Sequence, residues 1–215
     1  MLGLVINIIT WLLRLSNSDV LEASVFAGAF LLQLKDVCVN TMKRFAGDLF
    51  AGAELRPADK NAIVHAFDVD DTITMKPEGF DNTGLTKDQF FDAARDFPAD
   101  PAVVELAQML ASKGDRIAIA TARPAERLQE TIDYLKRHNV PFDQIMLSTG
   151  GEPSGVAKQA MLQKLQEDYK QVGTLFDDSP YNIQGAQMQG IDAVHLRKND
   201  DYWAQHPERV FPYGL

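Results

Sequence analysis

Apolar and polar positions follow a pattern that changes at about residue 60. After this point, short apolar runs typical of buried strands stand at residues 62–67, 116–120, 142–147, 172–176 and 191–196. Apolar residues at helical spacing separate these runs, at residues 101–113, up to about 138, 154–170 and 181–189. Such alternation predicts an α/β fold: a Rossmann-like parallel sheet of about five strands, with right-handed crossovers and helices on both faces.

Residues 1–60 show a different pattern. Residues 1–15 are strongly apolar, but polar residues interrupt them, and they fall short of the roughly 20 apolar residues that a membrane-spanning helix needs. They also lack the basic segment that precedes the apolar run of a signal peptide. Apolar residues recur near helical spacing from 19 to 45, and Pro57 with its polar neighbours indicates a linker at residues 52–61.

We therefore expect two parts: an N-terminal helical hairpin with its linker over residues 1–60, and the main domain over residues 61–215. The hairpin is expected to pack on the main domain or on a second subunit, which would make the protein a homo-oligomer. Two alternatives stay open. In one, Trp11 and the apolar first helix lie at a membrane interface; in the other, the hairpin is a lid over the active site.

Composition and charge narrow the class of protein. The chain has 215 residues, of which 46% are apolar and 24% are charged, as in an ordinary soluble globular protein. Its net charge is −9 and it has no basic stripe, which argues against an extended nucleic-acid-binding surface. Cys38 is the only cysteine, so no intrachain disulfide can form, and we expect a reducing, cytoplasmic setting.

Three carboxylates follow the first strand directly, in the sequence DVDDT of residues 68–72. Ligands of open α/β sheets bind just beyond the carboxyl ends of the strands, so Asp68, Asp70 and Asp71 stand where a site is expected. Crowded carboxylates repel each other, and a divalent cation relieves that repulsion; their hard oxygens suit Mg²⁺. One carboxylate could attack as a nucleophile while its neighbour transfers protons. Taken alone, the motif could also be an acidic turn.

Two further strand ends carry polar side chains. Thr121 follows the second strand, and Asp177 and Asp178 follow the fourth. Because the carboxyl ends of parallel strands meet at one edge of a sheet, these residues are expected to lie beside Asp68. The convergence of three strand ends predicts a functional site.

These motifs together resemble the signature of the haloacid dehalogenase-like (HAD) superfamily of phosphohydrolases, over about residues 62–200. Residues 68–72 match its first motif, DxDx(T/V) after an apolar strand. Thr121 matches the second motif, in which an apolar strand ends in Thr or Ser. The paired acids at residues 177 and 178 match the fourth.

The third motif of this superfamily is a lysine or arginine some twenty residues before the last motif. Lys158 fits it, with Lys164 and Lys170 as alternatives. We prefer Lys158 because it stands at the start of its predicted helix, at the edge of the site.

The resemblance implies a phosphatase that works through an aspartyl phosphate. In such an enzyme Asp68 is the nucleophile, and Asp70 protonates the leaving oxygen and then activates water. Lys158 neutralises the charge of the nucleophile and the phosphate, and Thr121 with the backbone around it binds the transferring phosphoryl group.

The resemblance also implies a metal ion and substrate contacts. The ion is Mg²⁺, held by Asp68, the backbone carbonyl of Asp70 and Asp178, with Asp177 as a direct or water-mediated partner. Thr72, Ala122 and Arg123 are the residues expected to contact the substrate.

The size of the insertions bears on the substrate. Superfamily members often select substrates with a cap domain placed after the first motif or between the second and third. Here residues 73–98, with one short helix expected at 88–95, are available at the first place, and a helix, a strand and a loop fully use residues 121–158. We expect a small cap or none, and an open site that admits a bulky phosphoester or the end of a polymer.

Three features are similar to the 3′-phosphatase domain of phage-type polynucleotide kinase. They are TARP at residues 121–124, PAVVELAQML at residues 101–110, and the 19-residue interval from Lys158 to Asp177. This likeness implies a nucleotide or a nucleic-acid end as substrate, with Arg123 as a substrate-phosphate or loop-ordering residue. The chain has no P-loop for a kinase half.

Three alternatives stay open at this point. One is a phosphatase of another small phosphoester, and a second is a phosphotransferase that passes the phosphoryl group to an alcohol. The third is a non-catalytic, membrane-associated scaffold in which residues 1–45 are the functional part.

Overall fold

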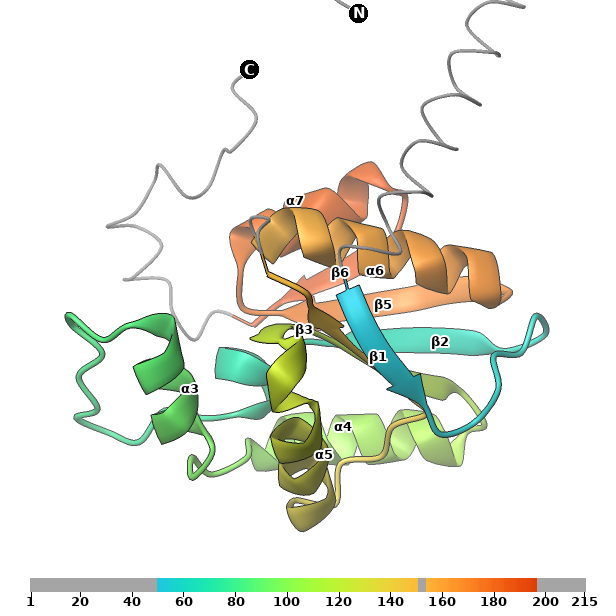
Figure 1. Ribbon diagram of the computed structural model, residues 1–215. Helices are drawn as coiled ribbons and strands as arrows, with labels where there is room; N and C mark the ends of the chain where they lie inside the picture. Colours follow the sequence, from blue (N-terminus) through green and yellow to red (C-terminus); the bar gives the residue numbers. More distant parts are fainter. Residues whose placement is uncertain (1–49, 151–153, 197–215) are drawn as a thin grey trace, which may run out of the picture. The chain divides into compact units, whose positions relative to one another are not determined.

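The computed structural model describes residues 50–150 and 154–196, which form a six-stranded sheet with helices on both faces (Figure 1). The strands lie in the order β1-β4-β3-β2-β5-β6. Their bounds are Phe50–Glu54 for β1, Ile63–Phe67 for β2, Arg116–Pro124 for β3, Gln144–Ser148 for β4, Gln171–Asp177 for β5 and Asp192–His195 for β6. Strands β2 to β6 pair in parallel, and β1 pairs with β4 in antiparallel orientation. The predicted Rossmann-like fold is confirmed.

Two layers of helices cover the sheet (Figure 1). The helices α4 (Pro101–Ser112) and α5 (Leu128–Arg137) pack on one face, and α6 (Ser154–Asp168) and α7 (Pro180–Met188) pack on the other. Short turns η1 (Val69–Ile73) and η2 (Ala125–Arg127) follow β2 and β3, and α3 (Lys87–Ala94) lies between η1 and α4. The helices on both faces are therefore as the sequence predicts.

Side chains at neighbouring positions of a strand point to opposite faces of the sheet. On the α6 side of β2 and β3 they are small, because Ala66, Ala118 and Ala120 stand there. On the opposite side they are larger, as with Phe67. The small side chains let α6 approach the sheet closely, and this matters for the site because α6 carries Lys158.

The strand β1 is the main difference from the sequence prediction. Its residues overlap the linker expected at residues 52–61, but they pair with β4, with Ala51 opposite Leu147. Gly52 lies directly against the carbonyl of Ile145, where a side chain would collide. The sequence FAGAE has neither β-branched residues nor a regular apolar–polar alternation, so it carries no strand signal.

The predicted helical hairpin, and with it the homo-oligomer, lid and membrane alternatives, falls on residues outside the described part of the chain. The described residues all belong to one unit, Ala46–Leu215. Among them, no helix is both long enough and apolar enough to cross a membrane.

Residues 75–99 form a small insertion between η1 and α4, which we call the cap segment. It leaves and rejoins the domain at one point, where Thr74 pairs with Ala99 and the Met75 N–H donates to the Pro98 carbonyl at 2.8 Å. The helix α3 belongs to this segment, which lies beside the carboxyl ends of the strands (Figure 1). The cap is therefore small, as predicted.

Asp143, just before β4, is joined to β3 by buried contacts and to the residues after β1 by an exposed one, and substitutions compare the two. Its buried carboxylate accepts from the Ile117 N–H at 2.9 Å and pairs with Arg116 at 3.2 Å and with Arg56, which follows β1. We expect Asp143→Ala to lower the free energy of unfolding by about 2–3 kcal/mol, because it leaves a mostly buried arginine and a buried N–H without their acceptor. Arg56→Ala removes an exposed side chain and should cost less than about 1 kcal/mol. Urea unfolding measures the free energy of unfolding of both variants. Equal losses would show that the buried contacts of Asp143 add nothing to its pair with Arg56.

Candidate active site

The first motif begins where β2 ends. The Asp68 N–H donates to the Phe176 carbonyl of β5 at 3.0 Å, and the chain then turns through η1. Asp71 takes the left-handed conformation (φ 58°), which Asp tolerates better than most residues. Its N–H donates to the Thr74 hydroxyl at 2.9 Å, which stabilises the turn. The turn directs the side chains of Asp68 and Asp70 to different partners, which are Lys158 and Arg123.

Lys158 connects three strands of the sheet. Its ammonium donates to the Asp68 carboxylate at 2.6 Å and to the Ala120 carbonyl of β3, and it lies 3.0 Å from the carboxylate of Asp177 at the end of β5. The Lys158 side chain is only 1% exposed. Lys164, in contrast, pairs with a carboxylate of its own helix. The structure thus brings Lys158 to the predicted nucleophile.

Burial and charge act on this cluster in opposite directions. Burial raises the pKa of Asp68 to about 7, and the negative charges of Asp177 and Asp70 add to this rise while Lys158 opposes it. Burial alone would lower the pKa of Lys158, but Asp177 and Asp68 raise it, so the ammonium keeps its charge. The carboxylates outnumber the ammonium, which leaves negative charge that a further cation would offset.

The carboxylate of Asp177 is saturated by donors of the protein. Its Oδ1 accepts from the Ser179 N–H and from Asn182 Nδ2, both at 2.9 Å. Its Oδ2 accepts from the same amide nitrogen at 3.0 Å and faces the Lys158 ammonium at 3.0 Å. A carboxylate has about four lone-pair positions, so these contacts occupy all of them. Asp177 therefore acts first as an anchor for Lys158.

Asp70 is held by Arg123 through a bidentate ion pair. Arg123 Nε donates to Oδ2 at 2.9 Å, and Nη2 donates to Oδ1 at 2.7 Å. The guanidinium is fully buried, lies 5.8 Å from the ring centroid of Tyr134, and donates from Nη1 to the Thr131 hydroxyl at 3.4 Å. The Asp70 side chain keeps 15% exposure. These engaged donors favour the loop-ordering role of Arg123 over a contact with substrate phosphate.

The other residues predicted to bind substrate lie around the same strand ends. Thr121 is buried, and its hydroxyl accepts from the Arg123 N–H at 3.2 Å. The pairing of β3 with β4 shifts between Thr121 and Pro124, so the backbone at Ala122 and Arg123 leaves the ladder. Thr72 lies fully buried within η1. Substrate contact by these residues stays a prediction.

Comparison with known proteins decides the family. A family model described as HAD superfamily, subfamily IIIB (acid phosphatase), matches residues 33–210. The chain belongs to this family. The prediction of an HAD-like phosphatase is therefore confirmed. A search of curated proteins finds no match to this HAD phosphatase.

Solved structures share the fold at low sequence identity. A chain of the Pnkp1/Rnl/Hen1 RNA repair complex has a TM-score of 0.53 at 16% identity, and the match covers 66% of this HAD phosphatase and 45% of that chain. This chain thus spans less than half the length of the RNA repair chain. The class C acid phosphatase from Bacillus anthracis with tungstate bound has a TM-score of 0.50 at 19% identity, with 72% of this chain and 74% of that chain covered.

HAD phosphatases use a divalent metal, and the residues present here fit one. One carboxylate oxygen each of Asp68, Asp177 and Asp178 lies within 4.8 Å of the others. These are buried, hard oxygen ligands of the kind that Mg²⁺ prefers. Asp68, Asp177 and Asp178 are thus the carboxylates suited to hold the ion, and direct or water-mediated ligation by Asp177 stays a prediction. Both carboxylate oxygens of Asp70 accept hydrogen bonds from Arg123, and metal ligation by the backbone carbonyl of Asp70 stays a prediction.

Sequence patterns do not single out two residues of this region. Asn182 is buried beside Asp177, and its Oδ1 has no hydrogen-bond partner within the described ranges. It lies four residues after Asp178, in the first turn of α7, and a polar residue one helical turn beyond a strand-end acid is a signal that could have found it. Arg127 pairs with the cap segment, and no motif marks it.

We expect Mg²⁺ to stabilise the protein through Asp178. At a Mg²⁺ concentration of 100 times Kd, binding adds about 2.7 kcal/mol to the free energy of unfolding and raises Tm. Asp178→Asn should remove most of this shift, because one of the carboxylates expected to hold the ion loses its charge. Asp192→Asn, at an exposed position of β6, is the matched control and should keep the shift. Differential scanning fluorimetry with and without Mg²⁺ measures the effect; a full shift in Asp178→Asn would place the ion elsewhere.

Proposed function

We propose that the protein hydrolyses phosphomonoesters in a Mg²⁺-dependent reaction that passes through a phosphoryl group on Asp68. The observation that carries this proposal is that the two carboxylates of the first motif pair with different cations, Asp68 with Lys158 and Asp70 with Arg123. Two carboxylates in different surroundings are typical of a division between a nucleophile and a proton-transfer group.

Asp68 and Asp70 act in sequence. A carboxylate oxygen of Asp68 forms a bond to phosphorus while the bond from phosphorus to the leaving oxygen breaks, and Asp70, which enters this step in its protonated form, gives its proton to that oxygen. Asp70, now a carboxylate beside Arg123, takes a proton from water. The water oxygen then displaces Asp68 from phosphorus, and the products are an alcohol and inorganic phosphate.

Other groups of the chain reduce the repulsion that this attack must overcome. The Lys158 ammonium lies 2.6 Å from Asp68 and offsets its charge as the phosphate approaches. In this proposal, the Thr121 hydroxyl and the backbone around Ala122 hydrogen-bond the phosphoryl oxygens; the departure of this backbone from the ladder with β4 supports that role. When bound, Mg²⁺ would supply further positive charge against the same repulsion.

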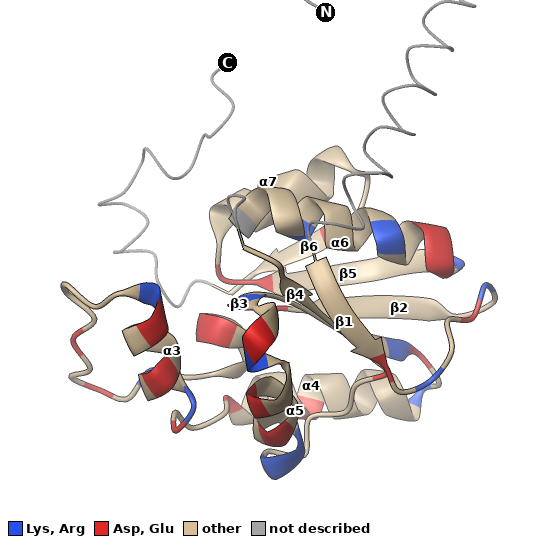
Figure 2. Cartoon of the chain, viewed as in Figure 1, with Lys and Arg blue, Asp and Glu red and all other residues tan. Residues whose placement is uncertain are grey.

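We propose a nucleotide, or the phosphorylated end of a nucleic acid, as the substrate. The TARP segment and the small cap segment support this proposal. The charge of the cap favours a short substrate, because residues 75–99 contain five acidic and three basic side chains, and this excess of negative charge disfavours a long polyanion (Figure 2). The same observation favours the alternative of another small phosphoester over a polymer. A phosphotransferase is less well supported, because a small cap does not exclude water.

Hydrolysis of an aryl phosphate with Mg²⁺ or with EDTA tests the proposal. We expect Mg²⁺-dependent turnover by the wild type, and losses of at least about 100-fold in Asp68→Asn and Asp70→Asn, which remove the nucleophile and the proton-transfer group. Nucleoside monophosphates and 3′-phosphorylated oligonucleotides are then compared by kcat/KM, and the mononucleotides should be preferred. A folded, Mg²⁺-binding wild type that hydrolyses none of these esters would contradict the proposal.

Arg123→Lys tests the orientation of Asp70. Lysine keeps the charge but loses the planar fork, so the variant should lower kcat by about 10- to 100-fold and change KM by less than about twofold. Arg95→Lys, at an exposed position of the cap segment, is the control and should leave both constants unchanged. Steady-state kinetics with the aryl phosphate measures both. A raised KM with an unchanged kcat would instead indicate that Arg123 binds substrate phosphate.

A further inference from the structure

The cap segment (residues 75–99) has a small aromatic core of its own. The ring centroids of Phe80 and Phe97 are 4.7 Å apart, and Phe90 lies 6.2 Å from Phe97. Both ends of the segment leave the domain at one point, beside Thr74. A segment that is joined at one point keeps its orientation only when side chains tie it to the rest of the domain.

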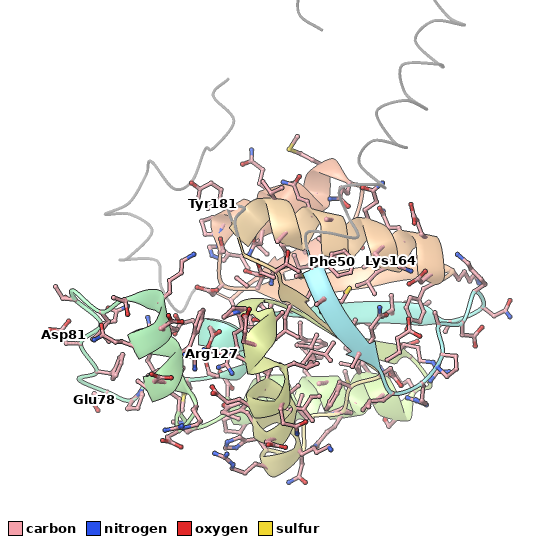
Figure 3. All side chains as sticks on the ribbon, in the orientation of Figure 1. Phe50, Glu78, Asp81, Arg127, Lys164 and Tyr181 are labelled. Atoms are coloured by element: carbon pink, nitrogen blue, oxygen red, sulfur yellow. The ribbon has the colours of Figure 1, made fainter. Side chains whose placement is uncertain are left out.

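Arg127 provides such a tie. Its Nη1 donates to the Asp92 carboxylate at 2.8 Å, its Nη2 donates to the Asp88 carbonyl at 3.2 Å, and its guanidinium carbon lies 5.5 Å from the ring centroid of Phe91. All three partners belong to α3, and Figure 3 shows Arg127 between α3 and the start of α5. The Arg127 side chain is 14% exposed, because the cap helix covers it.

The backbone of Arg127 belongs to the part of the site that orients Asp70. Arg127 is the last residue of η2, which directly follows β3. Its carbonyl accepts from the Thr131 hydroxyl at 2.8 Å, and the same hydroxyl accepts from Arg123 at 3.4 Å. Arg123 in turn holds Asp70. Arg127 thus contacts α3 through its side chain and, through its carbonyl, the Thr131 hydroxyl that contacts Arg123.

The root of the cap segment lies next to the reacting groups. Lys76 of the cap pairs with Asp71 at 3.0 Å, and Asp71 is the neighbour of Asp70 in the chain. Under the proposed function Asp70 protonates the leaving oxygen, so the leaving group of the substrate lies toward the cap segment.

We propose that Arg127 is a positioning residue that sets the specificity for the leaving group by fixing the cap segment beside it. This inference rests on the proposed function. Without the guanidinium, the cap loses its ion pairs to η2 and keeps only the exposed contacts of Arg137 with residues 95 and 96, so it holds the leaving group less well. Binding of the phosphoryl group by Thr121 and Lys158 does not depend on the cap and stays as it is.

Kinetics of Arg127→Gln test the effect on the leaving group. KM for an ester with a large aromatic leaving group, such as naphthyl phosphate, should rise about fivefold, which corresponds to about 1 kcal/mol, while kcat changes by less than about twofold. The Ki of inorganic phosphate, which has no leaving group, should not change. Lys136→Gln removes a charge from an exposed position of α5, the helix that follows η2, and should change none of these values. An equal rise in Ki would overturn the proposal, because Arg127 would then bind the phosphate itself.

Limited proteolysis tests the tie without any substrate. Lys87 and Arg95, at the two ends of α3, are exposed trypsin sites. Cleavage at both should be several-fold faster in Arg127→Gln and in Asp92→Asn, which removes the same ion pair from an exposed position and preserves the fold. Unchanged cleavage in both variants would overturn the proposal. If the wild type hydrolyses no phosphomonoester, the proposed function fails, and the cleavage rates still show whether Arg127 anchors the cap.

Discussion

The buried ammonium of Lys158 is the interaction on which the rest of the site depends. It contacts the carboxylates of Asp68 and Asp177 and the carbonyl of Ala120, so one charge links β2, β3 and β5. A buried ammonium and a buried carboxylate are each costly alone, and here each offsets the cost of the other. The contact forms because small side chains on this face of the sheet let α6 lie close to the strands. Packing in the core therefore determines the position of the Lys158 ammonium.

A second buried cation separates the roles of the two motif carboxylates. Arg123 holds both oxygens of Asp70, while Lys158 holds Asp68, so neighbouring acids have different environments. The same arginine contacts Thr131, whose hydroxyl donates to the carbonyl of the cap-binding Arg127. A continuous set of polar contacts thus runs from the cap segment to Asp70. The proposed role of the cap segment therefore needs no large inserted domain.

Much of the fold and the site could be predicted from the sequence, and the exceptions have physical reasons. The apolar runs of β2 and β5 predicted these strands. Because ligands bind at the carboxyl ends of parallel strands, the sequence also predicted that Asp68 and Asp178 lie together, and they do. The strand β1 was missed because FAGAE has no periodicity and is held by pairing with a distant partner. Arg123 meets Asp70 across 53 residues, and Arg127 meets α3 across 35, so only the folded chain shows these pairs.

The central claim is that the phosphoryl group passes through the carboxylate of Asp68. The most direct test is to quench the enzyme during turnover with Mg²⁺ and to treat it with borohydride, which reduces an aspartyl phosphate to homoserine. Tandem mass spectrometry of the peptide that contains residue 68 then locates the change. The account predicts homoserine at position 68, and none when substrate is omitted. Turnover without homoserine at this position, or with the change at another carboxylate, would contradict it.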